Sequence, residues 1–220
     1  MLKIRGFVAF VFVAGMCLDL FAAQTFKQQF DASYGFGKEG MVQSTSWKPN
    51  WGFFSGHRLR VGPSLRHSFF LGDDSVSLKR VDGKKVSSSS VSLDVVTPKS
   101  HSINAGFEVS YALWDRFELG MNLDLIGTSL GRSESATYRS GTVSSETADV
   151  PAFNLFLYGK RDIGHLNSEF FLGYRCKNGL GLRAGLNHFL TEFESDRSLE
   201  GETRFRKFLD FYFVSLSYRY

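Results

Sequence analysis

The sequence predicts an all-β protein: an antiparallel transmembrane β-barrel of eight strands that follows a cleaved signal peptide. Three observations support this prediction. Apolar and polar residues alternate up to the last residue of the chain, the N-terminus has the order of an export signal, and the chain contains 23 Phe and 8 Tyr. In a barrel, aromatic side chains of this number face lipid and form girdles at the two membrane interfaces.

Residues 1–23 predict a secretory signal peptide. A basic start is followed by an apolar run from Phe7 to Leu18 and by the small pair Ala22 and Ala23. The apolar run is short for a membrane span, and Asp19 interrupts it. We place the cleavage after Ala23, with cleavage after Ala22 as the alternative. Residues 24–220 then form a single outer-membrane β-barrel domain.

The two cysteines carry little chemistry in this interpretation. Lipidation of Cys17 is a rival to simple cleavage, but Met16 is larger than the residue that normally precedes a lipidated cysteine. Cleavage leaves only Cys176, so no intramolecular disulfide can form. We interpret Cys176 as a small apolar residue at a strand end, and expect no metal and no cofactor. The net charge of +4 is mild, and export together with the lack of a basic cluster argues against nucleic acid.

Period-2 alternation defines the strands. In residues 103–113, apolar side chains alternate with Asn104, Gly106 and Glu108, whereas a helix would need spacings of three and four. The eight predicted strands are residues 30–37, 58–65, 103–113, 117–125, 153–159, 166–176, 180–190 and 210–220. Loops are expected between them, and the long ones are residues 38–56, 73–101, 131–150 and 192–206.

This count leaves a difficulty about sidedness. If the last strand ends in the periplasm, residues 73–101 and 131–150 also fall on the periplasmic side. Periplasmic turns of such barrels are usually the short ones. Two further strands, near residues 86–96 and 137–143, would restore the usual arrangement, so a barrel of ten strands stays open as the alternative.

Charged residues on the inner face of the predicted strands are the first candidate site. Charged side chains cannot face lipid cheaply, and a buried ion needs a partner. We therefore expect a paired network that plugs the lumen, and the alternative is a polar path for a small solute. The network is expected to contain Glu108, Glu118, Asp124, Glu169, Arg175 and Arg183.

His188 is the second candidate. Some small barrel enzymes that modify lipid A pair a serine and a histidine of the barrel wall with a carboxylate on the outer side. Here Thr191 and Ser195 are the nearest hydroxyls in the sequence, and they match no known motif. We prefer a histidine at the membrane interface without a catalytic role, and predict that the protein is not an enzyme.

The C-terminal strand carries the third feature. Its outward face holds Val214, Leu216, Tyr218 and Tyr220, the last residue. A terminal strand that ends in an aromatic residue resembles the C-terminal signal of bacterial outer-membrane barrels. The resemblance implies recognition by the barrel assembly machinery and a location in the outer membrane, in contact with membrane lipid and lipopolysaccharide.

From residue 103 onward, about half of the chain resembles outer-membrane β-barrel proteins of the Bacteroidetes type. The segments that carry the resemblance are residues 119–127 (LGMNLDLIG), 162–170 (DIGHLNSEF) and 204–207 (RFRK). The resemblance implies the fold and the location of a small OmpA-like barrel, but no activity and no site residues.

The sequence therefore favours a structural or interaction role, in which a plugged barrel presents surface loops. A narrow pore for small solutes is the alternative, and a lipid A-modifying barrel enzyme is the second alternative. The oligomeric state stays open.

Overall fold

The computed structural model describes residues 25–82, 85–86, 91–140, 142–157, 161–199 and 201–220. The predicted signal peptide lies outside the described residues. These contain fourteen strands and one 3-10 turn, η1 (Ser55–His57). The strands are β1 Thr25–Gly37, β2 Gly40–Phe53, β3 Leu59–Gly72, β4 Ser75–Asp82, β5 Lys85–Val86, β6 Ser92–Val96, β7 Lys99–Ala112, β8 Phe117–Leu130, β9 Glu134–Ser140, β10 Thr142–Asp149, β11 Phe153–Leu155, β12 Leu166–Arg175, β13 Leu180–Leu199 and β14 Glu202–Arg219. Within the described ranges, no helix is long and apolar enough to cross a membrane.

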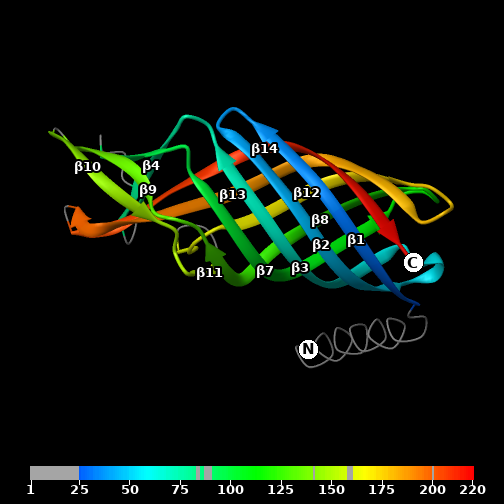
Figure 1. Ribbon diagram of the computed structural model, residues 1–220. Coiled ribbons are helices and arrows are strands. Elements are labelled where there is room, and N and C mark those ends of the chain that lie inside the picture. The colour runs from blue at the N-terminus through cyan, green and yellow to red at the C-terminus, as the bar shows by residue number, and fades with distance from the viewer. Residues whose placement is uncertain (1–24, 83–84, 87–90, 141, 158–160, 200) are drawn as a thin grey trace, which may run out of the picture.

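Eight of the strands close into one antiparallel ring, which we call the barrel (Figure 1). Its order is β1-β2-β3-β7-β8-β12-β13-β14, and β14 returns to pair with β1 from Gln29↔Arg219 to Phe36↔Tyr212. Closure leaves no free sheet edge in the ring, as a membrane-spanning sheet requires.

A second, smaller ring extends the barrel at one end, and we call it the head. The ends of β13 and β14 continue past the barrel, and β4, β6, β9 and β10 complete the ring. The ring closes where Phe205 pairs with Arg80 and where Ala148 pairs with Ser195. Figure 1 shows the head at the end opposite to the C-terminus, with β4, β9 and β10 beyond the barrel.

The described residues contain fourteen strands, more than the eight or ten that the sequence predicts, and eight of the fourteen form the barrel ring. Residues 38–56 are not a loop but contain β2. Of the predicted strand 153–159, residues 153–155 form β11, a three-residue partner of β8, and residues 158–159 lie outside the described residues. The predicted loops 73–101 and 131–150 contain the head strands. The predicted loop 192–206 consists mainly of the ends of β13 and β14.

These corrections remove the difficulty about sidedness. The connections at the end that holds the chain terminus are the short ones, residues 54–58, 113–116 and 176–179. The long excursions 73–98 and 131–165 both leave from the opposite end. This is the usual asymmetry of outer-membrane barrels, with short turns in the periplasm and long segments outside.

The barrel exterior is an apolar belt. Outward positions of β1 and β14 are occupied by exposed residues such as Phe30, Tyr34, Leu216 and Tyr218. Aromatic rings lie at both ends of the belt. Phe26 and Trp51 are in contact at the end where the C-terminus lies, and Phe36 lies close to Tyr212 at the head end. An exterior of this kind is typical of a barrel that faces lipid.

Two apolar clusters fill the interior at the head end. Five side chains inside the barrel rim form the first cluster: Val42, Phe70, Phe189, Leu209 and Phe211. The second cluster fills the head and includes Leu78, Leu93, Tyr138, Phe193 and Phe205. Large buried apolar side chains make this end of the molecule a packed core.

Candidate functional site

The barrel lumen holds a network of ion pairs, and its middle layer is balanced in charge. Arg183 on β13 reaches Glu108 on β7 at 2.8 Å and Asp31 on β1 at 3.2 Å. Lys48 on β2 contacts the same two carboxylates, and its Nζ lies 2.9 Å from Glu108 Oε2. All four side chains are buried, so each charge depends on the others for its stabilisation.

Glu118 on β8 is surrounded by arginines near the barrel mouth, by which we mean the open end of the barrel where the C-terminus lies. Its carboxylate lies 2.9 Å from Arg60 Nη1 and 2.9 Å from Arg183 Nη2. Arg175 also pairs with it, and Arg219 Nη1 lies 3.7 Å away. Arg60 and Arg175 are each 19% exposed at the side chain, so this layer opens toward solvent while the middle layer does not.

The upper layer of the lumen is centred on Arg66. Its guanidinium lies 2.9 Å from Glu169 Oε2 and 3.6 Å from Asp124 Oδ1. Asp124 also accepts hydrogen bonds from the Asn104 side chain at 2.8 Å and from the backbone N–H of Asn167 at 3.1 Å. The side chains of Arg66, Asp124 and Glu169 are at most 6% exposed, which places this layer out of contact with bulk solvent.

A buried histidine separates the ion pairs from the apolar end. His165 Nε2 lies 3.2 Å from Thr191 Oγ1, and His165 Nδ1 lies 3.4 Å from Ser129 Oγ. Its ring packs against Phe189 of the barrel cluster and Phe193 of the head cluster. The lumen therefore runs from charged layers through a polar layer into two apolar cores.

The structure places all six sequence-predicted charges in this network, and adds five that the sequence reasoning left out. The added residues are Asp31, Lys48, Arg60, Arg66 and Arg219. Four of these lie on the inward face of strands that were already predicted or on their direct extension, so the same period-2 rule could have found them. Lys48 lies on β2, which the sequence analysis had assigned to a loop.

His188 and the two hydroxyl residues nearest to it in the sequence are not brought together. His188 lies on the outer wall, where Nδ1 is 2.6 Å from Asp210 Oδ1 and the ring stacks on Phe208. Thr191 is buried against His165, and Ser195 donates its hydroxyl hydrogen bond to backbone carbonyls in the head. The hydroxyl–histidine arrangement considered for a lipid A enzyme is thus not assembled from these residues.

Metal-binding chemistry has no cluster to build on in the described part of the chain, where no group of three or more His, Cys, Asp or Glu side chains could hold an ion. Cys176 is exposed and unpaired directly after β12. Its position at a hairpin agrees with a strand-end residue.

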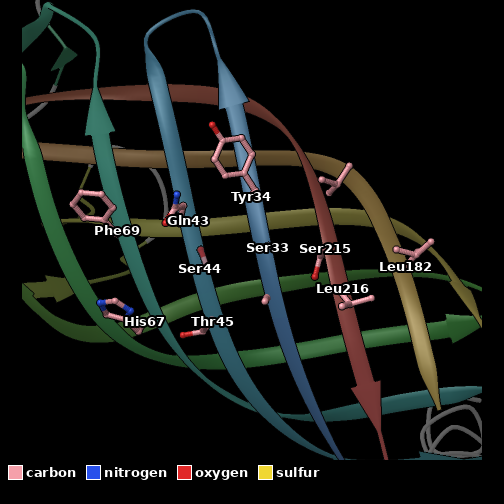
Figure 2. A pocket seen from close by; sticks show the side chains of 12 residues that line it. Ser33, Tyr34, Gln43, Ser44, Thr45, His67, Phe69, Leu182, Ser215 and Leu216 are labelled. Atoms are coloured by element: carbon pink, nitrogen blue, oxygen red, sulfur yellow. The ribbon is translucent and has the colours of Figure 1, made fainter. Parts of the chain in front are cut away.

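A hollow of about 580 Å³ lies on the outer wall over β14, β1, β2 and β3 (Figure 2). The small residues Ala32 and Thr45 are paired across β1 and β2 in its lining, which also includes the larger Tyr34 and Leu216. His67 lies at its edge, and His67 Nε2 is 3.1 Å from His101 Nδ1. Because the hollow belongs to the apolar belt, we expect hydrocarbon chains to fill it.

No protein-family model matches the sequence, and no curated protein matches it either. Among solved structures, the chain is similar to the outer membrane protein Ail of Yersinia pestis, at 12% identity and a TM-score of 0.39, covering 89% of this chain and 100% of Ail. It is similar to a major outer membrane protein of Thermus thermophilus at 13% identity and a TM-score of 0.40, covering 89% and 100%. Neisserial surface protein A is similar at 14% identity and a TM-score of 0.31, covering 88% and 98%. TM-scores this low mark only a loose likeness. The membrane barrel is indicated instead by the apolar exterior of the strands and by the pairing of β14 with β1 that closes the ring.

Proposed function

We propose that this protein is a non-enzymatic barrel of the bacterial outer membrane whose sealed lumen anchors a rigid head outside the cell, where the head contacts other molecules. One observation supports the proposal most directly. Three layers of paired charges and two apolar clusters follow one another along the interior of the barrel and head. An eight-stranded barrel has room for side chains and little else in its interior.

The head is built for contact rather than for passage. It is a closed ring with an apolar interior, so the residues that remain for function are on its outer surface. Because the ring is closed, the head strands are already ordered before a partner binds. Binding to them therefore loses less conformational entropy than binding to a flexible loop would. These features support a binding role over a transport role.

The location is supported by the exterior and by the final strand. Val214, Leu216 and Tyr218 of β14 and the following Tyr220 are exposed on the outside, in the positions expected for the C-terminal assembly signal. Recognition by the assembly machinery, contact with lipopolysaccharide and kinship with Bacteroidetes-type barrels belong to the proposal. Charge pairs at the head end of the belt, such as Lys207 with Glu39 at 2.6 Å, are suited to polar headgroups.

Single-channel recording tests the seal. The refolded full-length protein is added to a planar bilayer, with circular dichroism and heat-modifiable gel migration as the folding controls. We expect a silent bilayer. Stable, discrete openings from the folded protein would contradict the sealed anchor and favour the narrow pore.

A headless variant tests the role of the head. Residues 75–96 and 134–149 are replaced by short Gly-Ser linkers, and the variant is returned to a strain that lacks the gene. We expect normal insertion and heat-modifiable migration together with the phenotype of the deletion strain. Full complementation by the headless barrel would show that the head is dispensable and overturn the proposal.

A further inference from the structure

Positive charge is in excess at the barrel mouth on the terminus side. In the middle layer, Lys48 and Arg183 match Asp31 and Glu108 in number. Three further arginines of the mouth, Arg60, Arg175 and Arg219, then share the single carboxylate of Glu118. The upper layer has one carboxylate more than it has arginines, because Asp124 and Glu169 share Arg66, but this layer lies beyond the middle layer and is closed to solvent.

Arg219 has bonding capacity to spare at this mouth. Its Nε and Nη2 both donate to Gln29 Oε1, with Nε at 2.8 Å. Its Nη1 has no hydrogen-bond partner among the described residues, although the side chain is only 6% exposed. A buried guanidinium N–H without an acceptor is costly, so this atom is suited to an additional anion. Since Nη1 lies 3.7 Å from Glu118 Oε2, it faces the same cluster as Arg60 and Arg175.

A pocket of about 710 Å³ adjoins this cluster between the β2–β3 turn and the β7–β8 turn. Arg58 and Arg60 contribute the basic groups of its lining and Asp115 an acidic one, so basic groups outnumber acidic ones by two to one. Phe54, Tyr111 and Trp114 contribute aromatic rings. The turn itself is held in an unusual backbone conformation, with φ of 64° at Phe54 and 52° at His57. Left-handed conformations at residues other than glycine cost energy and are frequent at binding sites.

We propose that this mouth is a binding site for a phosphate-class anion, held by Arg58, Arg60 and Arg219. Guanidinium groups match the oxygens of phosphate in pairs and keep their charge at any physiological pH. The aromatic rings at the rim are of the kind that lies at headgroup depth, so the anion has two sources. It is the headgroup of an anionic phospholipid in the adjoining leaflet, or a phosphate-bearing solute on that side of the membrane. The inference depends on the barrel and not on the role of the head.

Side-chain NMR of the arginines, with isothermal titration calorimetry alongside, tests the site on the refolded full-length protein. In the first arm, inorganic phosphate is titrated into protein in zwitterionic detergent. In the second arm, the protein is placed in phosphatidylcholine nanodiscs with increasing phosphatidylglycerol and no free phosphate. We expect saturable shifts of the Arg60 and Arg219 Nε–Hε signals in at least one arm, and the responding arm identifies the source.

Two charge-removing variants and a matched control decide the outcome. We expect Arg60→Gln and Arg58→Gln each to weaken binding about tenfold, the loss that one charge-assisted hydrogen bond accounts for. Arg132→Gln removes an exposed arginine at the head end and should leave binding unchanged. Arg58 is exposed, so its variant carries the test if Arg60→Gln does not fold. The absence of saturable shifts in both arms, or equal binding by Arg58→Gln and the Arg132→Gln control, would overturn the proposal.

Discussion

Arg183 grips both carboxylate oxygens of Glu108, with Nη1 at 2.8 Å from Oε2 and Nη2 at 3.0 Å from Oε1, across 75 positions of the chain. The same guanidinium lies over the Phe171 ring, 4.1 Å from its centroid. One side chain thus connects β13, β7 and β12 through the middle of the lumen. A planar, bidentate donor is required for this, and lysine would not replace it.

Removal of Arg183 should therefore destabilise the whole barrel. Arg183→Leu leaves Glu108 and Asp31 with only Lys48 between them, and loss of one partner of a buried ion pair typically costs about 3–5 kcal/mol. Adding Glu108→Gln should recover part of this loss, because one uncompensated carboxylate is then neutral. Urea unfolding of the refolded protein in lipid vesicles measures both changes. Equal stability of Arg183→Leu and the wild type would show that the network does not support the barrel.

The head core should unfold separately from the barrel. Phe205 is fully buried in the head and packs edge-on against Tyr138, with ring centroids 6.0 Å apart. Phe205→Ala should cost the head about 3–5 kcal/mol. We expect a protease to cut the variant within residues 134–149 and to leave a heat-modifiable barrel fragment. Phe170→Ala, on the outer wall, is the control, and loss of barrel assembly by Phe205→Ala would show that the two rings fold as one unit.

Alternation identified the strands whose two faces see different environments. β7, β8, β12 and the second half of β14 place polar side chains in the lumen and apolar ones toward lipid, so their period of two is visible in the sequence. The same contrast placed the six charges of the network on inward faces. Pairing partners were not visible, because register connects residues far apart in the chain.

β2 was not predicted as a strand because its sequence contains residues that are typical of turns. Pro49 and Asn50 lie between Trp47 and Trp51, and the pairing with β3 is interrupted there, between Trp47↔Leu65 and Trp51↔Val61. Proline is accepted at such an irregularity because it has no N–H to donate. The opposing residue must be Gly62, since a Cβ there would meet the carbonyl oxygen of Pro49 at 1.9 Å. A short window of the sequence contains the proline but not the glycine on the neighbouring strand that makes room for it.

The strands of the head were not predicted for a different reason. β9 and β10 are rich in Ser, Thr and Glu and expose much of their length to solvent. Their few inward residues, such as Ala136 and Tyr138, are buried only because the ring closes around them. Since closure depends on partners in β6 and β13, no short window of the sequence reveals it.

The last residue should be needed for closure of the sheet. The backbone N–H of Tyr220 donates to Gln28 O at 3.0 Å, and the N–H of Gln28 donates to Tyr220 O at 3.1 Å. Deletion of residues 218–220 removes this pair, and we expect much less inserted protein in membrane fractions and in heat-modifiable gels. Tyr220→Ala keeps the backbone pair and tests the ring alone, with Tyr212→Ala on the same face as the control. Normal surface levels of the deletion variant would contradict a closing role for this end.

Acid should loosen the head through Glu146. Arg197 Nε donates to Glu146 Oε2 at 2.9 Å, and this hydrogen bond holds the pKa of the Glu146 carboxyl below its ordinary value of 4.5. A carboxyl with a lowered pKa in the folded state stabilises that state above the ordinary value, and the stabilisation disappears as the pH falls through the lowered one. We therefore expect amide protection in β10, corrected for intrinsic exchange, to fall as the pH drops below about 4.5. Glu146→Gln should flatten this dependence while the barrel amides of β7 and β8 stay protected, and an unchanged profile in Glu146→Gln would assign the acid response to another pair, such as Asp94 with Arg139.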